Sequence, residues 1–251
     1  MKPKQRQSEI AALIGRDGQV SVDALAERFD VSTETIRRDL GLLAEAGVVQ
    51  KVHGGAKRPR LQSESSFQQR MTENAVGKRT IAGKLAGIVE RGDTLFIDTG
   101  STTLACAEEL APTGGMTVIT NSLRIAQVFG SVGLENAVYL LGGGYSSDNA
   151  ETLGPLAIAQ IEAFQADYAV LTVAAIDSRA GVMDANFDEA QVARAMIGRS
   201  RNVVVVADAT KFDRRAAFQV CALSDVDLLV SDSRPALGLA NSLRAAEVTI
   251  R

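Results

Sequence analysis

The stretch that decides the fold of the amino-terminal part reads VSTETIRRDLGLL over Val31–Leu43 and VVQKVHGGA over Val48–Ala56. Three apolar residues of the first part share one helical face: Ile36, Leu40 and Leu43. The second part is rich in β-branched residues over Val48–Val52 and then reaches Gly54-Gly55, which favours a sharp turn. The pattern predicts a helix followed by a β-wing.

Two further helices are predicted before this one. Apolar residues at helical spacing indicate a first helix within about residues 4–16, which ends at Asp17-Gly18. Ser21 is a good N-cap for a second helix, and a short connection leads to Ser32, the N-cap of the third. Three helices and a wing predict a winged helix-turn-helix domain over residues 1–57.

The third helix and the wing point to double-stranded DNA as a partner. A helix fits the major groove, where base edges present a readable pattern of donors and acceptors. Arg37 and Arg38 can fork onto guanine or phosphate, and hydroxyls near the helix start suit phosphates. Lys51 and His53 of the wing can touch the DNA backbone or reach the minor groove. The candidate DNA-binding residues are Ser21, Ser32, Thr33, Glu34, Thr35, Arg37, Arg38, Lys51, His53 and Gly54.

The alternative for the third helix is that Glu34 and Arg38 form a surface ion pair at i, i+4 spacing, with Arg37 merely solvated. The charge distribution favours DNA binding. Residues 1–60 carry 11 Lys and Arg against 8 Asp and Glu, whereas the rest of the chain carries 16 against 22. A basic module joined to an acidic body fits a DNA reader carried by a separate domain.

Composition places the chain among globular proteins. Of 251 residues, 46% are hydrophobic, enough for a sizeable core. The two cysteines, Cys106 and Cys221, are interpreted as buried free thiols in a reducing cytoplasm.

The sequence has no apolar run of membrane-spanning length and no signal-peptide core, so we expect a cytoplasmic location. One histidine and two distant cysteines give no metal signature, and GGG at 142–144 lacks dinucleotide spacing, so no cofactor is expected.

The polar stretch after the wing predicts a linker over residues 58–74, and a second domain over residues 75–251. In that domain helices are predicted at Ala75–Glu90, Thr103–Leu110, Leu123–Phe129, Leu156–Ala163 and Glu189–Ser200. Strands are predicted at Thr94–Ile97, Thr117–Ile119, Ala137–Leu141, Tyr168–Val173, Asn202–Val206, Leu228–Val230 and Val248–Ile250. This alternation predicts a Rossmann-like α/β fold, with a mostly parallel sheet between two helical layers.

Polar and glycine-rich segments follow these strands, where open α/β sheets bind ligands. In DTGSTT at Asp98–Thr103, Gly100 allows a tight turn, and free N–H groups at a helix start favour an anion. Lys211 could neutralise a phosphate, and Asp98 or Asp177 could accept hydrogen bonds from sugar hydroxyls. The candidate effector-binding residues are Asp98, Thr99, Gly100, Ser101, Thr102, Thr103, Asn121, Ser122, Gly143, Asp177 and Lys211.

Each of these features has a structural alternative. The segment DTGSTT could be an ordinary turn before a helix with a Ser or Thr N-cap. Lys211 could be paired with Asp208 or Asp213 instead of a ligand.

In VSTETIRRDL, LAEAGVVQKVHGGA, DTGSTT and ADATKF, the sequence resembles the DeoR/GlpR-type family of bacterial regulators of sugar metabolism, over essentially the whole chain. The resemblance implies that the helix-turn-helix at about residues 20–39 binds operator DNA. It also implies a sensor domain related to ribose-5-phosphate isomerase and CoA transferases, which binds a phosphosugar. Two positions depart from the family pattern: VAAID has alanines where relatives often carry Gly, and Thr210 replaces the usual Ser.

These observations favour a transcriptional regulator, expected to repress a carbohydrate-use operon as a homodimer or homotetramer, and not an enzyme. The first alternative is a sugar-phosphate isomerase with an appended DNA-binding module. The carboxylates available as its general base are Asp98, Asp177, Asp184, Asp188 and Glu189. A second alternative is a DNA architectural protein whose body binds no ligand.

Overall fold

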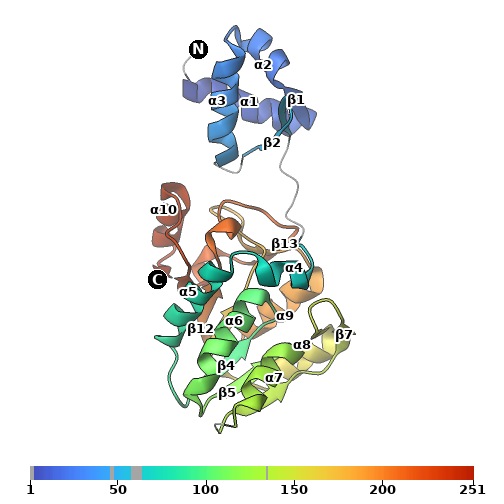
Figure 1. Ribbon diagram of the computed structural model, residues 1–251, viewed down its shortest axis with the longest axis vertical. Coiled ribbons are helices and arrows are strands. Elements are labelled where there is room, and N and C mark those ends of the chain that lie inside the picture. Colours follow the sequence, from blue (N-terminus) through green and yellow to red (C-terminus); the bar gives the residue numbers. More distant parts are fainter. Residues whose placement is uncertain (1–2, 46–47, 58–63, 134) are drawn as a thin grey trace. The chain divides into compact units, whose positions relative to one another are not determined.

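The computed structural model describes residues 3–45, 48–57, 64–133 and 135–251. The chain divides into two compact units, Met1–Leu61 and Gln62–Arg251, and Figure 1 shows their helices and strands. Residues 58–63 of the expected linker lie outside the described residues. Within the described ranges, no helix is long and apolar enough to cross a membrane.

The first unit is a winged helix-turn-helix, as predicted. Its elements are α1 (Pro3–Asp17), β1 (Gln19–Ser21), α2 (Val22–Phe29), α3 (Thr33–Glu45), β2 (Gln50–Val52) and β3 (Gly55–Lys57). The three strands form an antiparallel sheet in the order β1-β3-β2. Ser21 caps α2 by accepting from the Ala24 N–H at 3.2 Å, and Asp30 ends that helix in the left-handed region. The expected apolar face of α3 is buried against α1 and α2, with Ile36 at 0% and Leu40 at 1% exposure.

The second unit is built on a parallel seven-stranded sheet, which confirms the predicted α/β class. Its strands lie in the order β15-β14-β12-β9-β4-β5-β6. They are β4 (Thr94–Ile97), β5 (Thr117–Thr120), β6 (Ala137–Leu140), β9 (Ala166–Leu171), β12 (Ser200–Val206), β14 (Leu228–Val230) and β15 (Thr249–Ile250). The helices are α4 (Phe67–Thr72), α5 (Ala75–Ala86), α6 (Ser101–Leu110), α7 (Leu123–Ser131), α8 (Pro155–Ile161), α9 (Phe187–Ile197) and α10 (Leu237–Ala245).

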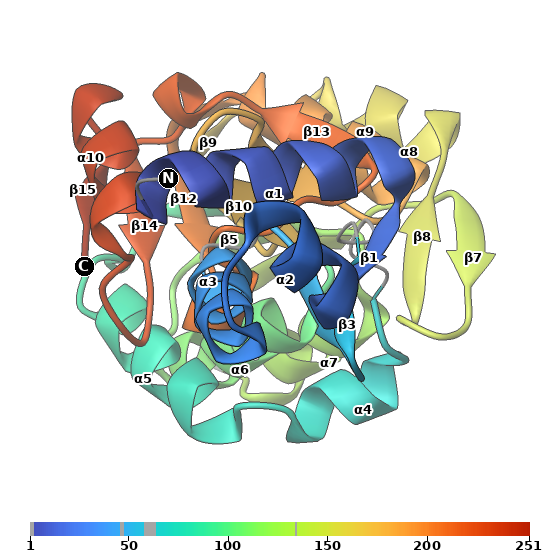
Figure 2. The same ribbon diagram turned by 90° about the horizontal axis from the view of Figure 1, so that it is seen from above.

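Helices cover both faces of this sheet. Figure 2 shows α5, α6 and α7 on one face and α8, α9 and α10 on the other. Alternate residues of a strand point to opposite faces, so a strand covered on both sides must be apolar throughout. In β12, Val203 and Val205 join the core under α8–α10, whereas Val204 and Val206 join the core under α5–α7.

The order of strands places a switch point at the centre of the sheet. From β4 the chain passes through α6 to β5 on one side, and from β9 it passes through α9 to β12 on the other. Because β4 and β9 are neighbours, the segments that follow them leave in opposite directions and open a crevice at their carboxyl ends. The segment Asp98–Thr103 begins in this crevice.

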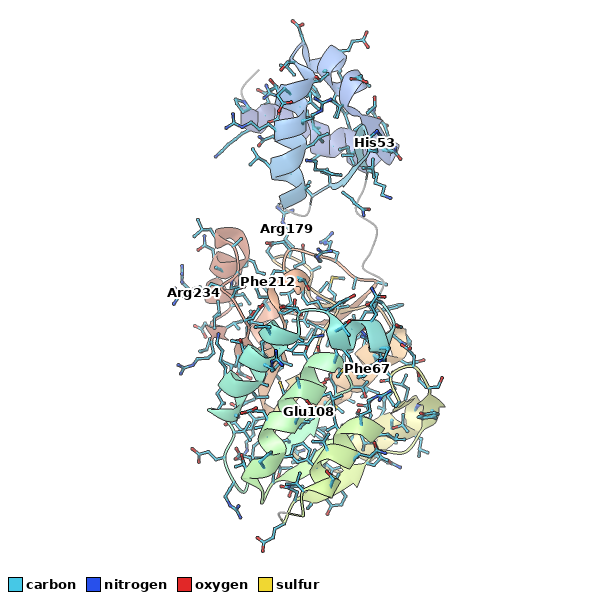
Figure 3. All side chains as sticks on the ribbon, in the orientation of Figure 1. His53, Phe67, Glu108, Arg179, Phe212 and Arg234 are labelled. Carbon is cyan, nitrogen blue, oxygen red and sulfur yellow. The ribbon has the colours of Figure 1, made fainter. Side chains whose placement is uncertain are left out.

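Several elements were not predicted from the sequence. The short antiparallel strands are β7 (Gly144–Ser146), β8 (Glu151–Leu153), β10 (Ala175–Asp177), β11 (Gly181–Asp184) and β13 (Phe218–Cys221). The carboxyl end of the expected linker forms α4, which begins after the N-cap Ser66 and buries Phe67 to 3% exposure. Figure 3 places Phe67 on this helix. α5 ends at Ala86 and not at Glu90, because the chain leaves the helix at Gly87.

Candidate nucleic-acid interface and anion site

The predicted DNA readers lie on the outer side of α3. Four of these residues are exposed, namely Ser32, Glu34, Arg37 and Arg38, and two are half-buried, Thr33 and Thr35. The inner side is formed by Ile36, Asp39 and Leu40, all below 4% exposure. This orientation leaves one long side of the helix free to enter a groove.

The hydroxyl groups at the helix starts already have local partners. Ser32 Oγ accepts from the Thr35 N–H at 3.2 Å and lies 2.9 Å from Thr35 Oγ1. Ser21 has the same role at α2. Both serines are exposed, so these caps position the helix ends at the surface.

The ion pair on α3 differs from the expected alternative. Glu34 pairs with Arg37 at i, i+3 spacing, and not with Arg38, with 3.5 Å between Oε2 and Nη1. Both side chains are more than 60% exposed. A pair of this kind contributes little stability, so Arg37 can exchange Glu34 for another anion at small cost.

A buried ion pair that was not predicted joins α1 to α3. Arg6 Nε lies 2.6 Å from Asp39 Oδ2, and Gln7 donates to Asp39 Oδ1 at 2.8 Å. Both charged side chains are below 10% exposure. The pair fixes α3 against α1 through the inner side of α3.

The wing is a tight hairpin. β2 and β3 pair at Val52–Gly55, so His53 and Gly54 form the turn, and Gly54 has φ +73°. Lys51 and His53 are exposed, and His53 is labelled on the wing in Figure 3. The hairpin therefore presents the Lys51 cation, from β2, and the His53 imidazole, from the turn, to the solvent.

In the second unit, the loop after β4 is held by the segment after β9. Both Asp98 carboxylate oxygens accept from the Thr172 N–H at 3.0 Å. Gly100 has an extended backbone with φ 176°, so it is not needed for the tight turn expected from the sequence. Instead, a Cβ at this position would lie 2.1 Å from Thr172 Cγ2, and glycine permits this close approach.

The start of α6 is buried and has polar groups without partners. Its N-cap, Gly100, supplies no side-chain hydrogen bond, so the first N–H groups of the helix have no cap. Among the described residues, the buried Thr99 Oγ1 also has no partner. Ser101 Oγ accepts from Lys78 Nζ at 2.8 Å, and Thr103 Oγ1 donates to the Gly100 carbonyl at 3.2 Å.

Three cationic side chains gather beside this helix start. Lys78 comes from α5 and donates to Ser101 Oγ and to the Arg70 carbonyl. Arg70 comes from α4 and is 7% exposed, and Lys211 ends the short helix after β12. Burial lowers the pKa of Lys78 and of Lys211, and the Asp208 carboxylate acts against that shift in both. Lys211 and Arg70 lower the pKa of Lys78 further, and Arg70 also lowers that of Lys211, so these charges are close enough to repel.

A set of carboxyl and amide groups lies next to these cations. Asn149 donates through Nδ2 to Glu151 Oε1 at 2.9 Å and to Glu189 Oε1 at 3.1 Å, and Arg70 donates to Asn149 Oδ1. Burial raises the pKa of Glu151. Burial and the neighbouring Glu151 charge raise the pKa of Glu189 to about 9, so the two carboxyl groups share a proton at neutral pH. Burial also raises the pKa of Asp184.

A cavity of about 280 Å³ opens onto these groups. Its lining includes Glu64, Arg70, Ser146, Asn149, Asn186 and Glu189. A second hollow, of about 340 Å³, lies between α6 and α7 and includes Leu104, Glu108 and Arg124. We regard the first as the candidate site, because buried ionisable groups converge on it and the second is a shallow surface hollow. Among the described residues, no group of three His, Cys, Asp or Glu side chains could hold a metal ion.

Some of the predicted effector residues border the crevice, and others lie in different places. Asp98–Thr103 and Lys211 border the crevice, and Asn121 reaches it by donating to Glu151 Oε2 at 3.3 Å. Ser122 caps α7, and Gly143 is exposed just before β7.

Asp177 has its hydrogen-bond and ion-pair partners in another sheet and its loops. It ends β10 and accepts from the Ala180 N–H at 2.7 Å, and it pairs with Arg215 at 3.4 Å. β9 ends at Leu171, so Asp177 does not follow the parallel strand directly but turns back in a separate sheet. Lys211 pairs with Glu64 Oε1 at 3.4 Å, and not with Asp208 or Asp213 as in the structural alternative.

Sequence reasoning missed the residues that come from outside the strand ends. Among them are Glu64, Arg70, Lys78, Asn149 and Glu151. Arg70 and Lys78 precede β4, on helices where a basic residue is ordinarily a solvated one. Glu151 lies in β8, which was not predicted, so its burial had no signal in the sequence.

Comparison with known proteins covers both units. Residues 6–62 match the family model described as the DeoR-like helix-turn-helix domain, and residues 73–233 match that of the DeoR C terminal sensor domain. The chain is 34% identical over 246 residues to the HTH-type transcriptional repressor CsqR of Escherichia coli (strain K12), covering 98% of this chain and 94% of that protein. It is 34% identical over 235 residues to the Glycerol-3-phosphate regulon repressor of the same organism, covering 94% and 93%. Among solved structures, ribose 5-phosphate isomerase A from Methanocaldococcus jannaschii is similar with a TM-score of 0.41 and 14% identity, over 56% of this chain and 55% of that chain.

Proposed function

The chain belongs to the DeoR family, and on that premise we propose that it is a transcriptional repressor that leaves its operator when a small phosphorylated sugar or polyol binds the second unit. The relatives named above are repressors, and one of them is named for a glycerol-3-phosphate regulon. The operon that this chain controls is then one of carbohydrate use, and its place of action is the cytoplasm.

The observation that carries the effector proposal is the cluster of Arg70, Lys78 and Lys211, in which Lys78 donates to Ser101 at the start of α6 and Glu64 joins the other two. A phosphate there would receive charge-assisted hydrogen bonds from the cations and from the free N–H groups of the helix. It would also supply an acceptor for Arg70 Nε and for Thr99 Oγ1, two buried polar atoms that lack a partner among the described residues. Phosphate is therefore the anion that best completes this crevice.

The rest of the ligand would lie toward the carboxyl and amide groups. Asn149 and a protonated Glu189 line one cavity and offer both donors and acceptors, and the buried Glu151 accepts from Asn149 beside it. Sugar hydroxyls both donate and accept, so they match this mixture better than an apolar or a purely anionic group would. This supports a polyhydroxylated ligand with one phosphate.

For DNA, the proposal assigns α3 to the major groove and the wing to the adjacent backbone. The outward side chains of α3 and the exposed Lys51 and His53 support it. Two or more subunits would place their recognition helices on operator half-sites, because operator symmetry mirrors protein symmetry.

The test measures operator release by fluorescence anisotropy. A labelled duplex selected from a random DNA library is bound to the full chain and titrated with glycerol 3-phosphate and with other sugar phosphates. Each is compared with its unphosphorylated form. We expect at least one phosphorylated compound to release the duplex, and no effect of the unphosphorylated partner. If none of them changes DNA affinity, the sensor proposal fails.

A matched pair of variants locates the phosphate. Lys78→Met removes a buried cation of the crevice, whereas Arg79→Met changes the next residue, which is exposed on the same helix. We expect only Lys78→Met to bind DNA without responding to the sugar phosphate. Equal responses in the two variants would move the phosphate away from this crevice.

The proposal excludes a catalytic role for the second unit. An isomerase needs a general base near the substrate carbon, whereas Glu189 shares a proton with Glu151 at neutral pH and both Asp98 oxygens accept from the Thr172 N–H. We expect no turnover of ribose 5-phosphate by the full chain in a coupled assay. Turnover that disappears in Asp184→Asn would support an isomerase instead.

A further inference from the structure

The crevice proposed for the phosphate already holds an anion of the chain itself. Glu64 Oε2 pairs with Arg70 Nη1, and Glu64 Oε1 lies 3.4 Å from Lys211 Nζ. The Glu64 side chain is 20% exposed, and its two partners are 9% and 18% exposed. A single, largely buried carboxylate therefore bridges Arg70 and Lys211, two of the three cations.

A carboxylate and a phosphate compete for the same partners. Both accept from guanidinium and ammonium groups, and the phosphate brings more charge and one more oxygen. A phosphate at the start of α6 would also bring a second anion next to Glu64, and like charges at such distances repel. The two anions therefore exclude each other from Arg70 and Lys211.

Glu64 satisfies the crevice only in part. With Glu64 in place, the buried Arg70 Nε and Thr99 Oγ1 still have no partner among the described residues. Lys78 is paired with a hydroxyl and a carbonyl instead of an anion. A ligand with a phosphate can gain contacts that Glu64 does not make, so displacement is favourable.

The position of Glu64 in the chain determines which segment is released when a phosphate replaces it. The second unit begins at Gln62, and Glu64 stands between that boundary and the N-cap of α4, Ser66. We propose that Glu64 is a built-in competitor of the effector phosphate, and that the effector displaces it and untethers the start of the second unit. This inference rests on the proposed function and describes how the same site is regulated.

The substitution Glu64→Gln removes the charge of Glu64 and keeps its shape. Inorganic phosphate is titrated by calorimetry into the full chain, into Glu64→Gln and into a control, Glu90→Gln, whose side chain is exposed. If Glu64 occupies the cations about nine-tenths of the time, its removal should tighten phosphate binding about tenfold. The control should bind phosphate as the unchanged chain does.

The other outcomes separate this inference from the proposed function. Equal or weaker phosphate binding in Glu64→Gln, with clear binding by the unchanged chain, overturns the role of Glu64 and leaves the phosphate site in place. No phosphate binding by any of the three proteins overturns the site itself and the inference with it.

Hydrogen exchange gives a readout that does not depend on affinity. The Phe67 N–H, three residues after Glu64, donates to Asp148 Oδ2 at 3.1 Å and reports on this segment. Phosphate should speed exchange of the Phe67 amide in the unchanged chain, because the tether at Glu64 is released. In Glu64→Gln the same amide should exchange faster without phosphate, and adding phosphate should change it little. Exchange of the Phe67 amide that is unchanged in the phosphate-bound chain would contradict displacement.

Discussion

At the scale of single residues, Asp39 shows how an ionic group can hold a small helical unit together. It is 3% exposed, and both of its oxygens are paired, with Arg6 and with Gln7. Asp39 was not singled out from the sequence, because a lone Asp on a helix is ordinarily solvated. The partner, Arg6, lies 33 residues earlier and could not be inferred from local spacing.

Replacing Asp39 with Asn should destabilise the first unit. The change leaves the Arg6 charge buried without a counter-ion, and breaking such a pair costs about 3 kcal/mol or more. The urea dependence of amide exchange within residues 3–57 measures the loss. Glu27→Gln, an exposed change on α2, serves as the control and should shift stability by less than about 0.5 kcal/mol. The double variant Arg6→Met, Asp39→Leu should recover most of the loss, and a failure to recover would show that the pair itself is needed.

The Glu189 carboxyl should make stability depend on pH. Its pKa is raised to about 9 from an ordinary value of 4.5, so the folded chain keeps a proton that the unfolded chain loses first. The stabilising contribution is complete below pH 4.5 and is lost as pH rises toward 9. Between pH 5 and pH 9 we expect the free energy of unfolding to fall by about 1.4 kcal/mol per pH unit on account of this group, about 5 kcal/mol in all. Urea unfolding of Glu189→Gln should show a flatter pH profile, whereas exposed Glu162→Gln should keep the original one.

At the scale of elements, α3 separates its side chains by direction. Successive residues of a helix are about 100° apart. The buried side is centred on Ile36 and Leu40, so Glu34 and Arg38 point almost directly away from it, while Arg37 lies on the flank. In a groove, the outermost side chains approach the base edges and the flanking ones approach the phosphates.

Substitutions of the two arginines should therefore differ in kind. Arg38→Ala should weaken binding to the selected duplex by about 1–3 kcal/mol and weaken binding to unrelated DNA much less. Arg37→Ala should weaken both alike and reduce the slope of log affinity against log salt by about 0.9. Anisotropy titrations at several salt concentrations measure both effects. The reverse assignment of the two patterns would contradict this orientation of α3.

Regular elements with a clear period could be predicted from the sequence, and the short antiparallel ones could not. β4 and β14 were predicted with their observed limits, since each is a short apolar run between turn residues. β10 and β11 are three and four residues long, so each is too short to show an alternation of apolar and polar residues. That omission also misplaced Asp177, which was assigned to the edge of the parallel sheet.

The residues of the candidate site divide in the same way, into those that the sequence could indicate and those that it could not. Asp98–Thr103 and Lys211 could be proposed from the sequence because the carboxyl ends of parallel strands meet at one edge. Arg70 and Lys78 reach that edge from helices that precede the first strand, and only the packing of α4 and α5 against α6 brings them there. A contact between segments this far apart has no local signature.

At the scale of the whole molecule, the proposed repressor links two binding reactions. If a sugar phosphate lowers the affinity for the operator by some factor, operator DNA must lower the affinity for that sugar phosphate by the same factor. We expect a factor of about 5 to 150, the usual range for such coupling. Calorimetric titration of the effector into the free chain and into the operator complex measures it from the second side. Unequal factors would show that the effector also changes the number of subunits in the complex.

The Arg6–Asp39 pair also bears on how the specificity of this repressor can change. The positions that secure α3, Ile36, Asp39 and Leu40, do not overlap with those that face outward, Glu34, Arg37 and Arg38. The outward positions can therefore be exchanged as a set without loosening the unit. A library randomised at those outward positions alone should yield well-folded variants that recognise new operators, each still controlled by the same metabolite.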